Sequence, residues 1–118
     1  MTPGPIIYVD TSALGALLVE QPESDALEQW LDQTTALQVS NDLLETELRR
    51  LAVREGLEQA DVTLLLDGVG LAALDRAVYR SAGLLPMPYL RTLDALHLEA
   101  AMRLDAAAVL TYDLTHDA

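Results

Sequence analysis

The fold is decided by a short stretch near the start of the chain, Ile6-Ile7-Tyr8-Val9-Asp10-Thr11-Ser12-Ala13-Leu14. Its first four residues form a β-favouring apolar run, which predicts a buried strand. The next three residues, Asp10, Thr11 and Ser12, carry side-chain oxygens that can accept the free N–H groups of a helix's first turn, so a helix is expected over 13–19. The stretch therefore predicts a strand that leads directly into a helix, with a carboxylate at the junction.

The same alternation of strands and helices continues along the chain. A helix is expected to end near residue 32, and a second one to run from a cap at 40–42 to about Gly56, a residue type typical of helix ends. The remaining elements are expected as strands at 36–39, 71–74 and 107–112 and helices at 58–67, 75–82 and 92–104. Within the 58–67 helix, Leu64, Leu65 and Leu66 are expected to be mostly buried. Alternating strands and helices predict βαβ units, an α/β fold and a mostly parallel sheet in one domain over 1–118.

Composition excludes several classes of site. The chain has 118 residues, 51% of them hydrophobic, a formal net charge of −12, no Cys and no Lys. Without Cys there is no disulfide framework, Cys-based zinc site or cysteine nucleophile. Without Lys, the usual phosphate-binding loop and Schiff-base chemistry are absent too. The charge argues against nonspecific binding of nucleic acid. The absence of a signal peptide or an apolar stretch of about 18 residues predicts a cytoplasmic protein with no membrane partner.

Acidic residues follow two of the expected strands. Asp10 comes after the first strand and Asp113 after the last, and ligands of α/β proteins bind at the carboxyl ends of parallel strands. Two helices supply further acids, namely Asp94 in one and either Glu45 or Glu47 in the other. Helix geometry does not choose between these two glutamates. Converging carboxylates repel one another, and a hard divalent cation such as Mg²⁺ or Mn²⁺ resolves that repulsion. Such an ion can activate water for phosphodiester cleavage.

Four segments together resemble a known family. They are Ile7-Tyr8-Val9-Asp10-Thr11-Ser12-Ala13-Leu14, Thr46-Glu47-Leu48-Arg49-Arg50-Leu51, Leu90-Arg91-Thr92-Leu93-Asp94-Ala95-Leu96-His97-Leu98 and Leu110-Thr111-Tyr112-Asp113. In this order and at about this spacing they look like a PIN domain, and more narrowly like the VapC-type ribonuclease toxins of bacterial toxin–antitoxin pairs. The resemblance covers nearly the whole chain, and the segment around Asp94 is its most specific part.

The resemblance implies a PIN-like α/β/α sandwich with a four- or five-stranded sheet. It also implies a Mg²⁺- or Mn²⁺-dependent endoribonuclease that cleaves tRNA, rRNA or mRNA, forms a homodimer and is neutralised by a VapB-like antitoxin. The implied acidic quartet is Asp10, Glu47, Asp94 and Asp113, with Asp10 and Asp94 as the principal metal ligands. The family register, an acid followed by Leu and Arg, favours Glu47 over Glu45. The family usually continues with a short helix and a last strand beyond the point where this sequence ends, so we expect either that the given sequence stops early or that the sheet lacks an edge strand.

Other polar residues are candidates for supporting roles. Thr11, Ser12 and Thr111 are expected either to hydrogen-bond the acidic ligands or to cap a helix and fill a strand end. His97 follows Asp94 by three residues and is expected to be a structural histidine close to the acids.

The cationic cluster Arg49, Arg50 and Arg54 is a candidate contact for RNA or for an antitoxin, or else a solvated face with local ion pairs. The apolar residues of the first two helices are expected to be core, or else to line a groove for a partner's apolar segment. The alternative to an enzyme is a PIN-like interaction module that has lost its activity.

Overall fold

The computed structural model describes residues 4–19 and 24–111. Strands and helices alternate along them as the sequence predicts, with bounds that differ by a few residues. The elements are β1 (Ile6–Val9), α1 (Thr11–Leu18), α2 (Ser24–Gln33), β2 (Leu37–Asn41), α3 (Leu43–Glu55), α4 (Gln59–Asp67), β3 (Gly70–Ala72), α5 (Arg76–Gly83), α6 (Thr92–Arg103) and β4 (Ala108–Leu110). Asp113 lies outside the described residues.

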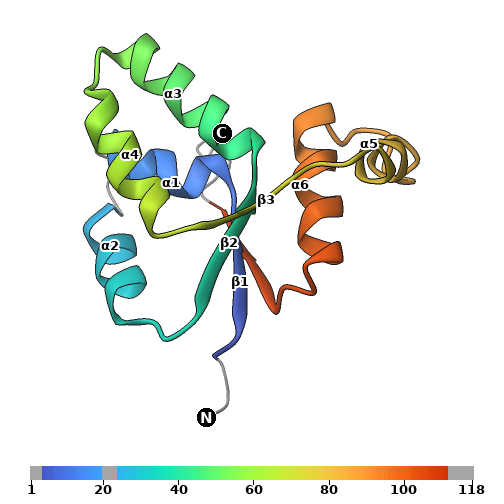
Figure 1. Ribbon diagram of the computed structural model, residues 1–118, viewed down its shortest axis with the longest axis horizontal. Coiled ribbons are helices and arrows are strands. Elements are labelled where there is room, and N and C mark those ends of the chain that lie inside the picture. The colour runs from blue at the N-terminus through green and yellow to red at the C-terminus, as the bar shows by residue number, and fades with distance from the viewer. Residues whose placement is uncertain (1–3, 20–23, 112–118) are drawn as a thin grey trace.

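The strands form one four-stranded sheet in the order β3-β2-β1-β4, and each of its neighbouring pairs is parallel. Helices α1 to α4 cover one face of this sheet, and α5 and α6 cover the other (Figure 1). The α/β fold with a parallel sheet between two helical layers is therefore confirmed. Parallel strands end at the same edge, so the residues that follow β1, β2 and β4 meet there.

Central strand β1 explains how the two faces differ. Ile7 and Val9 pack with Leu14, Leu44 and Leu48 in the larger core cluster on the side of α1 and α3. Successive side chains of a strand point to opposite faces. Tyr8 therefore belongs to the other cluster, with Val39 of β2 and the small residues Ala100 and Ala101 of α6. This alternation places a buried hydroxyl under α6.

Local chemistry sets the ends of the helices that follow β1 and β2. Asp10 is the N-cap of α1, and its side chain accepts a hydrogen bond from the backbone N–H of Ala13. At the start of α3, Asp42 makes no side-chain cap, whereas the side-chain oxygen of Asn41 accepts from the N–H of Leu43 at 2.7 Å. Helix α3 ends at Gly56, whose φ of 68° is the left-handed conformation that glycine adopts without steric cost.

The prediction that Leu64, Leu65 and Leu66 are all mostly buried is wrong for Leu64, which is 70% exposed. Helix α4 packs mainly through one side, with Val62 in the core and Leu66 against it. Three consecutive helical residues cannot all face one neighbour, because each turns by about 100° from the last. In the first two helices, Leu17, Leu18 and Leu31 do pack on the core, whereas Trp30 is 44% exposed.

Among residues 4–19 and 24–111, none of the helices combines the length and the apolar character needed to cross a bilayer.

Candidate active site

A pocket of about 1080 Å³ opens at the edge of the sheet where β1 and β4 end. Three of the predicted acids line it, and each comes from a different element: Asp10 from the end of β1, Glu47 from α3 and Asp94 from the first turn of α6. Thr11, Ser12 and Thr111 line the same pocket. The structure therefore places all the predicted acidic and hydroxyl residues at this pocket except Asp113, which is not described. Of the three predicted arginines, Arg50 and Arg54 line the pocket and Arg49 does not.

Asp10 is held by the first turn of the helix that it caps. Its Oδ1 atom accepts from the N–H of Ala13 at 3.1 Å and from the hydroxyl of Ser12 at 2.6 Å. The Ser12 hydroxyl also lies 3.0 Å from that of Thr111, just beyond β4. The N–H of Ala13 and the hydroxyl of Ser12 both donate to Oδ1 of Asp10. The other carboxylate oxygen, Oδ2, accepts no hydrogen bond from the described part of the chain.

The two candidate glutamates of α3 have different surroundings. Glu47 is half-buried, lines the pocket, and accepts hydrogen bonds on Oε1 from the Thr11 hydroxyl at 2.8 Å and from His97 Nε2 at 2.7 Å. Glu45 is exposed and forms an ion pair with Arg49 at 2.9 Å on the helix surface. Geometry thus supports Glu47 as the acid of the site, in agreement with the family register.

A buried hydrogen-bonded chain lies behind Glu47. Tyr8 Oη is 2.7 Å from His97 Nδ1, and Asn41 Nδ2 is 2.6 Å from Tyr8 Oη and 3.2 Å from His97 Nδ1. His97 was expected to be structural, and it is indeed buried and fully bonded, but one of its partners is the carboxylate of the site. Sequence reasoning missed Tyr8 and Asn41; the signal was a polar group inside each of two strands that are otherwise apolar.

Burial raises the pKa of the Tyr8 hydroxyl from 10.0 to about 12. The negative charges of Glu47 and Asp10 also raise this pKa, while the neighbouring polar side chains of Ser40 and Asn41 lower it. Tyr8 is therefore a neutral hydroxyl that can donate to His97 at physiological pH.

The raised pKa of Tyr8 predicts a loss of stability in alkali. Above pH 10 the unfolded chain ionises Tyr8 while the folded one does not, so stability present below pH 10 is lost as pH rises toward 12. Because the sequence has no Lys, tyrosines are the main side chains that titrate in this range. Urea unfolding at intervals from pH 9 to 11.5 should show a shallower pH dependence for Tyr8→Phe than for wild type. Tyr79→Phe, at a half-exposed tyrosine of α5, is the control, and equal slopes for both variants would contradict the assignment.

Asp94 lies at the exposed side of the pocket. Its Oδ2 atom accepts from Arg91 Nε at 3.0 Å, and the side chain of Arg91 is 86% exposed. An exposed ion pair of this kind contributes little to stability, so a divalent ion could displace Arg91 from the Asp94 carboxylate at little cost. As a first-turn residue of α6, the Asp94 carboxylate is also favoured by the positive end of the helix dipole.

The predicted arginine cluster divides into two parts. Arg50 and Arg54 line the acidic pocket. Arg49 does not, because its guanidinium binds Glu45 on its own helix and Gln59 and Thr63 on α4. Arg49 therefore joins α3 to α4, and Arg50 and Arg54 are the members of the cluster placed to meet a ligand of the pocket.

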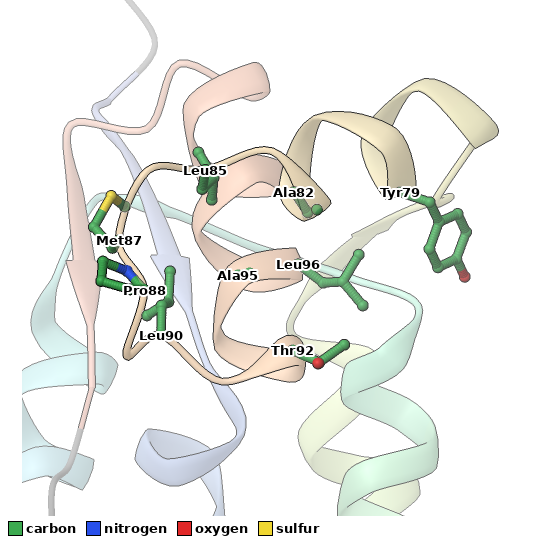
Figure 2. Close-up of a pocket in the computed structure, with 10 residues that line it drawn as sticks. Tyr79, Ala82, Leu85, Met87, Pro88, Leu90, Thr92, Ala95 and Leu96 are labelled. Carbon is green, nitrogen blue, oxygen red and sulfur yellow. The ribbon is translucent and has the colours of Figure 1, made fainter.

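A second, smaller hollow of about 330 Å³ lies between α5, the segment that follows it and α6. Figure 2 shows its lining, which includes Leu85, Met87, Pro88 and Leu90 and has no acidic side chain. No carboxylate or imidazole of the described residues lines it, so it lacks the side chains that usually bind a metal ion. The acidic pocket is therefore the candidate site for chemistry.

The donors of the acidic pocket fit a hard divalent cation. Carboxylate oxygens are the ligands that Mg²⁺ and Mn²⁺ prefer. Within residues 4–19 and 24–111, no three His, Asp or Glu side chains lie close enough together to hold one ion. Mg²⁺ does not need three, because it keeps several waters and is commonly bound by one or two carboxylates. The side chains present therefore suit an ion held by few carboxylates and by water.

The sheet and its acidic edge define an α/β protein whose site lies at the carboxyl ends of parallel strands. The family model for the PIN domain matches residues 7–118, and the chain belongs to that family. Among curated proteins it is similar to ribonuclease VapC35 of Mycobacterium tuberculosis, with 39% identity over 95% of this chain and 84% of the relative. Ribonuclease VapC46 of the same species is 40% identical over 91% of this chain and 84% of the relative. The chain is thus a homologue of the VapC ribonucleases.

A solved structure supports the fold independently. The crystal structure of M. tuberculosis VapC20, described as a toxin that cleaves the sarcin–ricin loop, superposes with a TM-score of 0.76. The superposition covers 92% of this chain and 90% of the other, at 14% sequence identity. At that identity the likeness shows a shared fold.

Proposed function

We propose that this protein is a Mg²⁺- or Mn²⁺-dependent endoribonuclease toxin that cleaves RNA phosphodiester bonds. The observation that carries the proposal is the convergence of Asp10, Glu47 and Asp94 from three elements on one pocket, in a chain homologous to VapC ribonucleases. Folding side chains of like charge into one pocket costs free energy unless a ligand compensates it. A divalent cation held by these carboxylates would provide that compensation.

Each residue has a proposed task. Asp10 and Asp94 would hold the ion as principal ligands, and Glu47 and Asp113 would hold a second ion or orient the attacking water. Thr11, Ser12 and Thr111 support the carboxylates through their hydroxyls, as the contacts of Thr11 with Glu47 and of Ser12 with Asp10 suggest. A bound ion supplies activation of water and stabilisation of the leaving oxygen.

Arg50 and Arg54 are proposed to bind phosphates of the RNA. They line the pocket, and guanidinium groups bind phosphate oxygens in pairs. With a net charge of −12, the chain as a whole repels RNA, so attraction has to come from these local cations and the metal.

Replacing Arg50 should therefore weaken RNA binding and its dependence on salt. In Arg50→Ala, the slope of log affinity against log salt concentration should fall by about 0.7, the value for one lost single-strand phosphate contact. Filter binding of a single-stranded RNA with Ca²⁺ in place of Mg²⁺ measures this without relying on cleavage. Arg49→Ala is the matched control, since Arg49 binds α4 outside the pocket. A slope unchanged by the loss of Arg50 would refute the assigned contact.

The partners follow from the same proposal. We propose a VapB-like antitoxin that neutralises the enzyme, a homodimer, and a cytoplasmic location where cellular RNA is the substrate. Support for an apolar contact comes from Leu84, 75% exposed, and Tyr89, 97% exposed, which belong to the same stretch of chain as several residues that line the smaller hollow. Exposed apolar side chains that gather in one region are typical of protein interfaces.

The test of the proposed activity is cleavage of RNA by the purified protein with and without added metal. We expect cleavage with Mg²⁺ or Mn²⁺ and none after treatment with a chelator, with activity restored when the metal is returned. A protein that neither cleaves RNA nor binds Mn²⁺ at millimolar concentration would instead be the inactive PIN-like interaction module.

A further inference from the structure

A buried chain of hydrogen bonds runs from Asn41 and Tyr8 through His97 and ends on Glu47. Tyr8 and Asn41 are fully buried, and the side chain of His97 is 9% exposed. The three residues come from β1, the end of β2 and α6, so the chain crosses from the sheet to the helix above it. Unpaired polar groups in such a position are costly, and here each side chain has a partner.

The direction of each hydrogen bond follows from the donors available. The N–H of Leu43 donates to Asn41 Oδ1, which fixes the amide so that Nδ2 faces Tyr8 and His97. An amide nitrogen can only donate, so Tyr8 Oη accepts from it and His97 Nδ1 faces it as an acceptor. The hydroxyl proton of Tyr8 then donates to His97 Nδ1 across 2.7 Å.

These directions determine the tautomer of His97. With Nδ1 accepting from Tyr8, the ring carries its proton on Nε2, and that N–H donates to Glu47 Oε1 at 2.7 Å. The Thr11 hydroxyl donates to the same oxygen at 2.8 Å. Both donors thus fall on Oε1, and Oε2 of Glu47 has no hydrogen-bond donor within the described residues.

We propose that Asn41 and Tyr8 lock His97 as the Nε2–H tautomer, and that His97 is a positioning residue that holds Glu47 for the metal site. Two hydrogen bonds to Oε1 fix the orientation of the Glu47 carboxylate. Its other oxygen, Oε2, is the one available to a metal ion or to a water bound to it. Glu47 reaches the pocket already oriented, so metal binding need not order it. The inference rests on the proposed function only in giving Glu47 this role.

The tautomer is tested on the wild-type protein without any substitution at the site. Long-range ¹H–¹⁵N NMR at pH 7 distinguishes the protonated and unprotonated ring nitrogens of each histidine. The sequence has two histidines, His97 and His116, so a spectrum of His116→Gln assigns the signals of His97. We expect protonated Nε2 and unprotonated Nδ1. An Nδ1–H ring, or one protonated at both nitrogens, would overturn the proposal.

A matched pair of variants tests the positioning role. In His97→Gln, the longer amide can still donate to Glu47 from near the Nε2 position. In His97→Asn, the shorter amide can meet Tyr8 but cannot reach Glu47. We expect His97→Asn to weaken Mn²⁺ binding about tenfold, as losses of such supporting partners do, and His97→Gln to retain most of it. Titration calorimetry measures the affinity for Mn²⁺, and thermal melts test whether both variants are folded.

Val62→Ala controls for general destabilisation, because Val62 is fully buried in α4 and does not line the pocket. It should leave Mn²⁺ affinity unchanged. Equal affinities for wild type, His97→Asn and His97→Gln would refute the positioning role while leaving the proposed function intact. A wild type that binds no Mn²⁺ would contradict the proposed function itself, and the role of His97 would fall with it.

Discussion

Asp10→Asn should lower the rate of metal-dependent RNA cleavage by more than about 100-fold. The estimate follows because loss of a supporting partner already costs about 10- to 100-fold at metal sites, and Asp10 is a proposed ligand. The substitution removes the negative charge of Asp10 and leaves the size and shape of the side chain nearly unchanged. Asparagine is as good an N-cap as aspartate, so its side-chain oxygen can keep the hydrogen bonds from Ala13 and Ser12. The fold should therefore persist while activity and Mn²⁺ affinity are lost together.

Glu45→Gln is the matched control for Asp10→Asn. It removes one negative charge from α3, the helix that carries Glu47, but Glu45 pairs with Arg49 and does not line the pocket. Its initial rate should stay within about twofold of wild type, since surface substitutions away from a site have small effects. Rates are compared at saturating Mn²⁺ on one labelled RNA. Full activity in Asp10→Asn would remove Asp10 from the site.

Leu48→Ala should destabilise the protein by about 2–5 kcal/mol, the usual range for a buried leucine. Leu48 is fully buried beside Glu47 on α3 and packs with Ile7, Val9 and Leu14. The truncation leaves a cavity between the sheet and the helix that carries the acid. At this chain length such a loss lowers the melting temperature by about 10 °C or more. Urea unfolding followed by circular dichroism measures it.

The control for Leu48 makes the same chemical change on the surface. Leu64 of α4 is 70% exposed, so Leu64→Ala should change the free energy of unfolding by about 0.5 kcal/mol or less. Comparable losses for the two variants would mean that the core is not where the structure puts it.

The sequence predicted most of the fold because its signals were local. The apolar run of β1, the cap at Asp10 and the glycine at 56 depend on neighbouring residues, and the structure confirms the elements that they begin or end. Leu64 was predicted wrongly because the burial of one helical face depends on which neighbours it packs against. That information is not local and appears only with the assembled layers.

The candidate site, like the fold, was predicted from the sequence only in part. Carboxylates at Asp10, Glu47 and Asp94 could be proposed from strand ends and family motifs, and the structure brings all three to one pocket. Helix geometry alone could not choose Glu47 over Glu45. That distinction depends on Thr11 and His97, which lie 36 and 50 residues away from Glu47 in the sequence. The Tyr8–His97 contact joins residues 89 positions apart, and no pattern in the sequence connects them.

The structure shows where part of the negative net charge lies. A value of −12 argues against binding RNA through bulk attraction. With Asp10, Glu47 and Asp94 in one pocket beside Arg50 and Arg54, part of that charge becomes a proposed metal site with its own local cations. The acidity then predicts a strict requirement for a divalent ion.

We propose that Asp10 and Asp94 hold a divalent ion in the acidic pocket, with Glu47 beside it. The test is a crystal structure of the protein crystallised with Mn²⁺, with diffraction data collected at the manganese absorption edge. We expect an anomalous peak in the acidic pocket with oxygen atoms of Asp10 and Asp94 as ligands, and with Glu47 still hydrogen-bonded to His97. Manganese bound only elsewhere, or an acidic pocket without a peak at saturating Mn²⁺, would contradict it.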